Sequence, residues 1–275
     1  VSLINMLYLV PTPIGNLEDI SYRSIQVLQS AELIFCEDTR VTKKLLSLLS
    51  EKLNITFPCT EFKSLHSHNE NQVIKTFTTE TFTRNIVYVS DAGMPCVSDP
   101  GATLVQYCIE NKVPYDVLPG ANAVLTAYAL SGFAHTEFTF YGFLAHKGKD
   151  RTTKLQKALN EDKLVILYES PHRLLKLLEE LNSLAPNKTI FLAKELTKLH
   201  QNTFKDTSSN LYEKFKSENI RGEWVVILEP SITDGENLTI EDIQDLKLQP
   251  KVKAKLLSKL TGRTVKDIYQ ELSED

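Results

Sequence analysis

Short apolar runs alternate with amphipathic stretches along the first 130 residues, and each apolar run ends in a polar, turn-rich loop. The runs predict buried strands at residues 7–10, 33–36, 86–89 and 115–118. Apolar residues at helical spacing follow at residues 20–28, at Leu45, Leu46 and Leu49, at 102–111 and at 124–130, and a helix is also expected over 69–82. Strands that alternate with helices in this order are typical of a parallel α/β sheet.

The pattern continues past residue 130 and then changes near Pro230. Strands are predicted at residues 138–143, 164–168, 189–193 and 224–228, and helices at 174–184 and 210–216. Some connections here are short, so we expect mixed strand directions. Residues 231–237 are typical of a linker, and two short helices follow, with capping boxes at Thr239-x-x-Asp242 and Thr264-x-x-Asp267. We therefore predict an α/β domain at 1–118, a second at 119–230, and a linker with a small helical tail at 231–275.

The loop at residues 89–101, VSDAGMPCVSDPG, is too polar and too kinked to continue the strand before it. One interpretation is a structural connection that caps the next helix. The interpretation that we favour is a strand end that opens into a ligand crevice. Loops of special composition also end the other strands, at residues 11–16, 37–40 and 119–123. Together they suit a small polar ligand that is held largely by main-chain groups.

Composition narrows the class of protein. A chain of 275 residues more readily forms two domains than one. No apolar run approaches the ~20 residues of a membrane helix and no secretion signal is evident, so we expect a cytoplasmic protein. The four cysteines lack ligand spacing and are expected to be free thiols. His66-x-His68 has no third ligand nearby, so no metal site is predicted.

The net charge of −4 argues against a protein that coats nucleic acid indiscriminately, but it leaves room for local basic surfaces. Basic residues gather at 40–44, 147–154 and 251–259. Each group is either a solvated helix face or part of an RNA-binding surface.

The common nucleotide and hydrolase motifs are absent: no GxGxxG follows the first strand, and there is no Walker A lysine and no GxSxG nucleophile. Six other motifs, spread over residues 7–229, resemble the ribosomal small subunit methyltransferase I family of the tetrapyrrole methylase superfamily. They are LVPTPIGNLED at 9–19, EDTR at 37–40, SDAGMP at 90–95, SDPG at 98–101, YESPHR at 168–173 and KELTK at 194–198.

This resemblance implies two α/β domains with S-adenosylmethionine in the cleft between them, and a homodimer. It implies 2′-O-methylation of a cytidine in the decoding region of 16S rRNA, with naked RNA or the 30S subunit as substrate. The implied cofactor contacts are Ile14, Asp91, Ala92, Gly93, Met94, Val97, Asn122, Ala123, Tyr168, Glu169 and Leu196. Two positions depart from the family pattern, because Met94 replaces a threonine and residues 119–123 read PGANA instead of PGPSA.

Methyl transfer to a ribose hydroxyl needs alignment and a base that removes the proton. Candidate bases on strand-end motifs are Asp38, Glu169, His172 and Glu195. Candidates for contact with RNA phosphates are Arg40, Arg173, Lys194 and Lys198. Purely structural roles stay open, with residues 37–40 as a helix N-terminus and His172–Arg173 as an exposed first turn after a proline.

Two other functions share parts of this pattern. One is a tetrapyrrole C-methyltransferase of the same superfamily, against which the EDTR and YESPHR motifs and the proline-rich first loop speak. The other is a catalytically inactive RNA-binding or ribosome-assembly protein, which would not need the site motifs to be retained. We interpret the loop at 89–101 as a cofactor cradle with Asp91 as its polar side-chain contact and the proton chemistry supplied from elsewhere.

Overall fold

The computed structural model of the chain describes residues 6–231 and 239–274, apart from the side chains of Thr79 and Glu274. Contacts group the chain into two compact units, Val1–Pro230 and Ser231–Asp275. The predicted linker lies outside the described residues except for Ser231. The division of the first unit near residue 118 stays a prediction.

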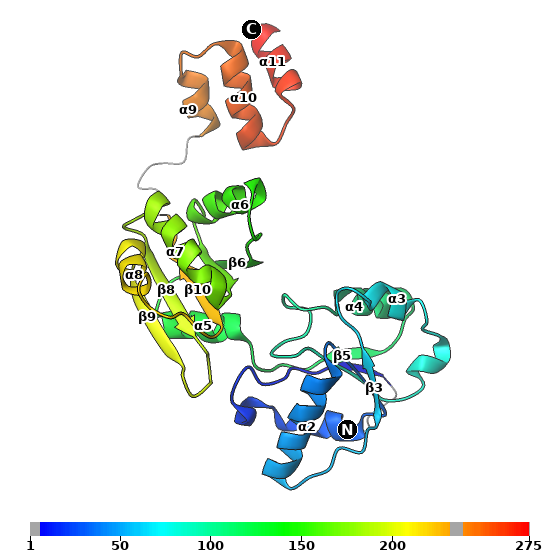
Figure 1. Ribbon diagram of the computed structural model, residues 1–275. Helices are drawn as coiled ribbons and strands as arrows, with labels where there is room; N and C mark the ends of the chain where they lie inside the picture. Colours follow the sequence, from blue (N-terminus) through cyan, green and yellow to red (C-terminus); the bar gives the residue numbers. More distant parts are fainter. Residues whose placement is uncertain (1–5, 232–238, 275) are drawn as a thin grey trace. The chain divides into compact units, whose positions relative to one another are not determined.

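The first sheet of the larger unit has five parallel strands in the order β3-β2-β4-β1-β5. Figure 1 labels its two edge strands, β3 and β5. The strands are β1 (Leu7–Leu9), β2 (Leu33–Cys36), β3 (Glu61–Ser64), β4 (Ile86–Val89) and β5 (Tyr115–Val117). The predicted parallel α/β sheet is confirmed. Its edge strand β3 was not expected, because the sequence EFKS has no apolar alternation.

Alternate side chains of these strands enter two separate cores. Tyr8 and Val10 share one core with helices α1 (Tyr22–Ser30) and α2 (Thr39–Leu53). Leu7 and Leu9 share the other with α4 (Ala102–Glu110) and with the 3-10 helix at Thr79–Phe82. Helices therefore cover both faces, as a parallel sheet requires, and the carboxyl ends of its strands stay free for a ligand. A 3-10 turn at Leu17–Asp19 and α3 (Glu70–Ile74) complete this part.

The second sheet is mixed and runs in the order β6-β7-β10-β8-β9. Its strands are β6 (Phe138–Phe143), β7 (Leu164–Glu169), β8 (Thr189–Lys194), β9 (Asn202–Thr207) and β10 (Trp224–Leu228). Among the strands that the structure describes in this sheet, only β6 and β7 pair in parallel, while β10 and β9 pair antiparallel with their neighbours. The expected mixed strand directions are confirmed.

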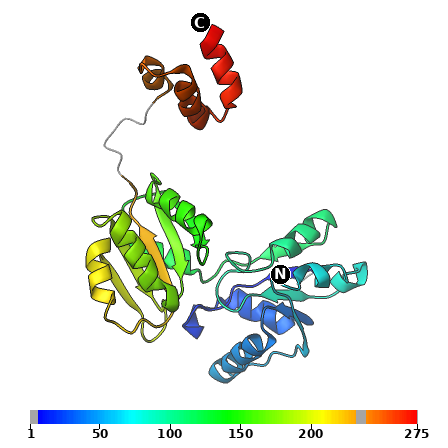
Figure 2. The same cartoon turned by 45° about the horizontal axis from the view of Figure 1, so that its top comes forward.

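Helices also cover the second sheet on both faces (Figure 2). On one face lie α6 (Lys149–Leu159), α7 (Pro171–Leu184) and α8 (Ser208–Phe215). On the other lies α5 (Ala123–Ser131), whose Val124 and Ala127 contact β7, β8 and β10. Pro171 begins α7 at a position where its missing N–H costs no hydrogen bond.

Four local differences from the predictions are found. The single helix expected over residues 69–82 is instead α3 followed by a separate 3-10 helix, which Thr78 begins with a capping box to Thr81. Strand β9 was not predicted, and neither was α6. The tail has three described helices where two were expected, namely α9 (Ile240–Asp245), α10 (Pro250–Thr261) and α11 (Val265–Glu274).

The smaller unit has its own apolar core, formed by Ile243, Ala254, Leu257 and Ile268. Thr239 and Asp242 form both hydrogen bonds of the predicted capping box at the start of α9. Among the helices that the structure describes, none is both long enough and apolar enough to cross a membrane.

Candidate active site

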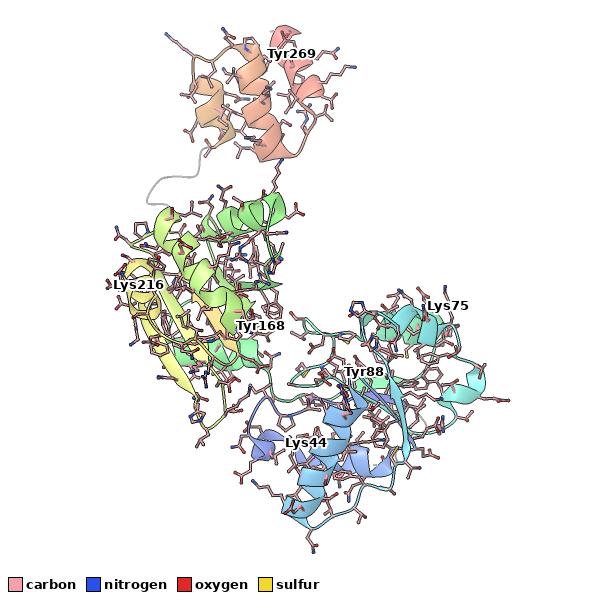
Figure 3. All side chains as sticks on the ribbon, viewed as in Figure 1. Lys44, Lys75, Tyr88, Tyr168, Lys216 and Tyr269 are labelled. Carbon is pink, nitrogen blue, oxygen red and sulfur yellow. The ribbon has the colours of Figure 1, made fainter. Side chains whose placement is uncertain are left out.

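A cavity of about 560 Å³ opens at the strand-end loops of the larger unit, a size typical of sites for small molecules. Residues from both sheets line it, among them Tyr168 of β7, which Figure 3 marks. It is lined by every residue that the resemblance implied as a cofactor contact, namely Ile14, Asp91, Ala92, Gly93, Met94, Val97, Asn122, Ala123, Tyr168, Glu169 and Leu196.

Close approaches between loops fix the shape of this cavity. Thr12 of the first loop forms an isolated antiparallel bridge with Gly93 of the central loop, with two N–H···O bonds of 3.0 Å. Gly93 has a φ of +84°, a left-handed backbone conformation that residues with a side chain rarely adopt. Asn16 donates its backbone N–H to Thr197 Oγ1 at 3.0 Å, which joins the first loop to the loop after β8. The first, central and later loops therefore support one another.

Asn122, one of the two departures from the family pattern, is the N-cap of α5. Its Oδ1 accepts the N–H of Leu125 at 3.0 Å. This capping explains locally why an asparagine suits the end of the PGAN turn.

Carboxylates dominate the polar lining. Among the described residues that line the cavity, Glu37, Asp91, Asp99, Glu169 and Glu223 carry carboxylates and none carries a basic side chain. Burial raises the pKa of Glu37 and of Asp91. Burial, with the charges of Glu37 and Asp91, raises the pKa of Asp99 to about 7. A cationic ligand would stabilise the ionised form of these carboxylates, so the lining favours a ligand with a positive charge.

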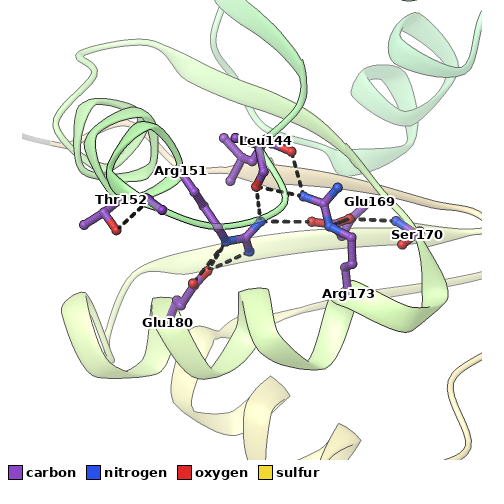
Figure 4. Close-up of polar contacts among 9 residues, drawn as sticks. Leu144, Arg151, Thr152, Glu169, Ser170, Arg173 and Glu180 are labelled. Atoms are coloured by element: carbon purple, nitrogen blue, oxygen red, sulfur yellow. Dashed lines mark hydrogen bonds and ion pairs between the residues drawn. The ribbon is translucent and has the colours of Figure 1, made fainter.

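Glu169 is the most enclosed of these carboxylates, since only 2% of its surface is exposed. Arg173 Nε lies 3.2 Å from its Oε1, and Arg151 Nη1 lies 3.9 Å from its Oε2 (Figure 4). Oε1 also accepts the N–H of Ser170 at 2.8 Å. Burial raises the pKa of Glu169 even though both arginines lower it.

The same cluster continues away from the cavity. Arg151 donates Nε and Nη2 to the carboxylate of Glu180 and Nη1 to the carbonyl of Ala145 (Figure 4). Arg173 Nη2 donates to the carbonyl of Leu144 at 2.7 Å. Two arginines and two glutamates thus form a buried network that fixes the end of β7.

The other predicted bases do not line the cavity. Asp38 caps α2 through the N–H of Arg40, and hydrogen bonds from Arg40 lower the pKa of Asp38 to about 2. His172 is exposed in the first turn of α7. Glu195 accepts the N–H of Glu223 at 2.9 Å and pairs with Lys198 at 3.0 Å. Of the four candidates, the structure brings only Glu169 to the cavity.

The candidates for RNA phosphate lie in different surroundings. Arg40 is exposed and pairs with Asp38. Lys194 lies over the ring of Trp224 and lines a second, smaller cavity of about 390 Å³. Lys198 bridges the carboxylates of Glu195 and Glu223. Arg173 belongs to the buried network, and phosphate contact by any of the four stays a prediction.

Several lining residues were not assigned a role from the sequence. Glu37 and Asp99 lie in the EDTR and SDPG motifs, so their motifs were noted but their side chains were not chosen. Trp224 begins β10 and Glu223 directly precedes it, where the sequence gives no sign of a site. Among the residues that the structure describes, no three His, Cys, Asp or Glu side chains form a group that could hold a metal ion.

The chain has two β-sheets covered by helices, and loops at the strand ends of both line one cavity. This arrangement is that of the tetrapyrrole methylase class. Residues 6–212 match the family model described as Tetrapyrrole (Corrin/Porphyrin) Methylases. In fold, the chain is similar to uroporphyrin-III C-methyl transferase from Thermus thermophilus complexed with S-adenyl homocysteine. The TM-score is 0.56 at 16% identity, over 81% of this chain and 96% of that one. It is also similar to diphthine synthase, with a TM-score of 0.60 at 13% identity over 82% and 90% of the two chains.

Sequence similarity narrows the class. The chain is 47% identical to ribosomal RNA small subunit methyltransferase I of Campylobacter fetus subsp. fetus (strain 82-40), over 97% of this chain and 99% of that protein. It is 43% identical to the protein of the same name from Helicobacter pylori (strain ATCC 700392 / 26695), over 98% and 99% of the two chains. The chain belongs to the ribosomal RNA small subunit methyltransferase I family. It is an S-adenosylmethionine-dependent methyltransferase, and the predicted family, fold class and cofactor are confirmed.

Proposed function

We propose that this protein methylates the 2′-hydroxyl of a cytidine ribose in the decoding region of 16S rRNA, with S-adenosylmethionine as the methyl donor. The proposal of an rRNA substrate is supported by one observation. Over nearly its whole length the chain is similar to relatives named as small subunit rRNA methyltransferases. The cytidine, its ribose hydroxyl and the decoding region rest on the resemblance of the motifs. The homodimer is part of the same proposal.

The residues of the cavity fit the cofactor. Its apolar wall includes Ile14, Val97 and Leu196, which suit an adenosine, and its carboxylates suit a cationic ligand. Bound S-adenosylmethionine supplies an electrophilic methyl group on a sulfonium. The protein's own part is to hold the ribose hydroxyl in line with that methyl group and to remove its proton, and alignment of this kind contributes roughly 7–11 kcal/mol in favourable cases.

Asp91 is the central polar contact in this proposal. Its Oδ1 accepts the N–H of Asp38 at 3.1 Å, and its own N–H donates to Glu37 Oε2 at 3.1 Å. The two loops after β2 and β4 are therefore locked together beside the cavity. An amide at residue 91 would weaken this lock and remove one of the charges that favour a cationic ligand.

Methyl transfer to isolated small subunits tests the proposal. Subunits from cells that lack the protein are incubated with purified protein and S-adenosylmethionine carrying a labelled methyl group. The rRNA is then cut with a ribonuclease into fragments that mass spectrometry locates in the sequence, and the labelled fragment is digested to nucleosides for a second mass spectrum. We expect one 2′-O-methylcytidine per subunit, located in the decoding region. Label on a base would contradict the ribose assignment. A parallel reaction contains uroporphyrinogen III in place of the subunits, and label on it but not on rRNA would favour the C-methyltransferase alternative.

A further inference from the structure

The smaller unit separates its basic and acidic residues along the chain. Residues 247–266 contain basic side chains and no acidic ones, while acidic residues lie before this segment in α9 and after it in α11. The basic residues are Lys247, Lys251, Lys253, Lys255, Lys259, Arg263 and Lys266. Most of them belong to α10, which contacts both α9 and α11 (Figure 1). A helix face that is only solvated usually mixes the two signs, so solvation alone does not account for this separation.

Three of these lysines form a stripe along α10. Lys251, Lys255 and Lys259 are spaced four residues apart, and all three are exposed. At a rise of about 1.5 Å per residue the lysine stripe runs for about 12 Å along the helix. That length lets each lysine meet a different phosphate of a nucleic acid strand.

The apolar side of α10 is already covered. Ala254 and Leu257 are buried in a core that they share with residues of α9 and α11. A helix that binds a membrane surface buries such a side in the lipid, so α10 does not suit a membrane. Val252 and Leu260 are exposed but lie more than two turns apart, and isolated apolar residues are normal on protein surfaces. The side of α10 that remains for a partner is the lysine stripe, which suits a polyanion.

The lysine stripe is unfavourable for the helix that carries it. Like charges four residues apart repel each other, so Lys255 destabilises α10 through both Lys251 and Lys259. Lys251 also lies in the first turn, where the helix dipole disfavours a positive charge. Among the described residues none of the three lysines forms an ion pair, and the ion pair of this unit joins Arg263 to Glu271. Helix stability therefore gives no reason for the stripe, whereas a bound polyanion would remove the repulsion.

Other basic residues of the chain are engaged with the protein itself. In the first basic group, Arg40 pairs with Asp38. In the second, Arg151 is buried and Lys154 donates to a main-chain carbonyl at 3.0 Å. In the third, Lys253 donates to a main-chain carbonyl of α9 at 2.7 Å, so it has a structural role that the lysine stripe does not share.

We propose that the lysine stripe of α10 is a second contact site for the rRNA substrate, where its ammonium groups bind backbone phosphates; the inference rests on the proposed function. Phosphate contacts position an RNA without reading its sequence. Every residue that lines the cavity precedes residue 231, so the stripe adds affinity for the RNA and takes no part in the chemistry. Two contacts on one chain also raise the effective concentration of the RNA at the second contact once the first has formed.

Binding measurements on the full chain test this proposal. Small subunits and protein-free 16S rRNA are the two probes, and each is titrated at several salt concentrations between about 50 and 200 mM. One variant carries glutamine at all three positions, Lys251→Gln/Lys255→Gln/Lys259→Gln, and a second carries arginine at the same positions. Glutamine keeps the helix propensity of lysine, and arginine keeps its charge.

We expect the glutamine variant to bind both probes about tenfold to a hundredfold more weakly at the lowest salt concentration. Its plot of log affinity against log salt concentration should be shallower by about 2 to 3, because three phosphate contacts are lost. The arginine variant should bind as the wild type does. Affinity for S-adenosylhomocysteine should be unchanged in both variants, and the midpoint of thermal unfolding should not fall, since glutamine removes the repulsion between the lysines.

The matched control removes the same charge elsewhere, in Lys75→Gln/Lys112→Gln/Lys176→Gln. These lysines are exposed on the larger unit, line neither cavity and lie outside the three basic groups. The control should bind both probes within about threefold of the wild type, because charges more than a Debye length of about 8–10 Å from the RNA are largely screened.

Three results would overturn the proposal. Unchanged affinity and salt dependence in the glutamine variant would show that the stripe is a solvated face. Equal losses in the glutamine variant and the control would show a general effect of net charge. A loss on intact subunits with an unchanged salt dependence, and none on protein-free rRNA, would assign the stripe to a ribosomal protein. Failure of the proposed function is a separate outcome, because binding is measured without methyl transfer and that failure appears as a wild type that makes no 2′-O-methylcytidine.

Discussion

Arg151 of α6 is a buried charged residue, since only 2% of it is exposed. It is held there by Glu180, Glu169 and a main-chain carbonyl. Removing one partner of a buried ion pair leaves uncompensated charge and costs about 3–5 kcal/mol. The cluster therefore stabilises the end of β7 only while it is complete.

Arg151→Met should lower the free energy of unfolding by about 3 kcal/mol, because Glu169 and Glu180 lose their shared cation. Urea denaturation followed by circular dichroism measures the change. Lys157→Met on the same helix is the control, since the side chain of Lys157 is 74% exposed and its loss should cost under about 0.5 kcal/mol. Equal losses in the two variants would show that the buried network contributes little.

Side-chain roles were the hardest part to predict from the sequence. The sequence shows Asp91 and Asp99 in one loop, but it does not show which of them is buried, which accepts backbone N–H groups, or which lies beside other carboxylates. Those properties depend on Glu37, which is more than fifty residues away along the chain. Arg173 likewise follows a proline as an exposed residue would, yet the carbonyls of residues 144 and 145 bind it.

At the scale of elements, the loop after β5 approaches the first loop so closely that only a glycine fits. A Cβ on Gly120 would lie 2.5 Å from Cβ and 2.8 Å from Cγ of Pro11. Both loops carry residues that line the cavity, Ile14 on one and Asn122 on the other. The contact therefore sets the spacing of two walls of the site.

Gly120→Ala should push these loops apart, weaken S-adenosylhomocysteine binding and lower stability by about 1–3 kcal/mol through overpacking. Calorimetry and thermal unfolding measure the two effects. Gly132→Ala is the control, because a Cβ at residue 132 meets nothing within 4 Å and only the φ of +63° is strained. That control should lose about 1 kcal/mol of stability and no affinity. Unchanged affinity in Gly120→Ala would contradict the role given to this contact.

Elements with a clear apolar pattern were the ones that could be predicted. Strands β2, β4 and β10 are fully buried and were recognised from their apolar runs. Strand β9 lies at a sheet edge with most of its side chains exposed, so pairing with β8 rather than its own sequence defines it. The helix expected over residues 69–82 is broken for a different reason. Thr78 caps a new 3-10 helix, and this cap replaces the hydrogen bonds of a continued helix.

At the scale of the whole molecule, the cavity belongs entirely to the larger unit. Every residue that lines it precedes residue 231, and the smaller unit has a core of its own. A chain that ends at Pro230 should therefore fold and bind S-adenosylhomocysteine with the affinity of the full chain. Calorimetry on the two proteins measures this, and a loss of more than about tenfold would mean that residues 231–275 contribute to the site.

Methyl transfer removes a positive charge from a cavity lined by five carboxylates. The donor enters as a sulfonium cation, and the thioether that remains is neutral. Coulomb attraction to carboxylates is stronger in a partly enclosed site than in water, so the attraction due to the sulfonium is lost when the reaction occurs. The cavity thus favours the loaded form of the cofactor over the demethylated form, and the chemical step promotes departure of its own product.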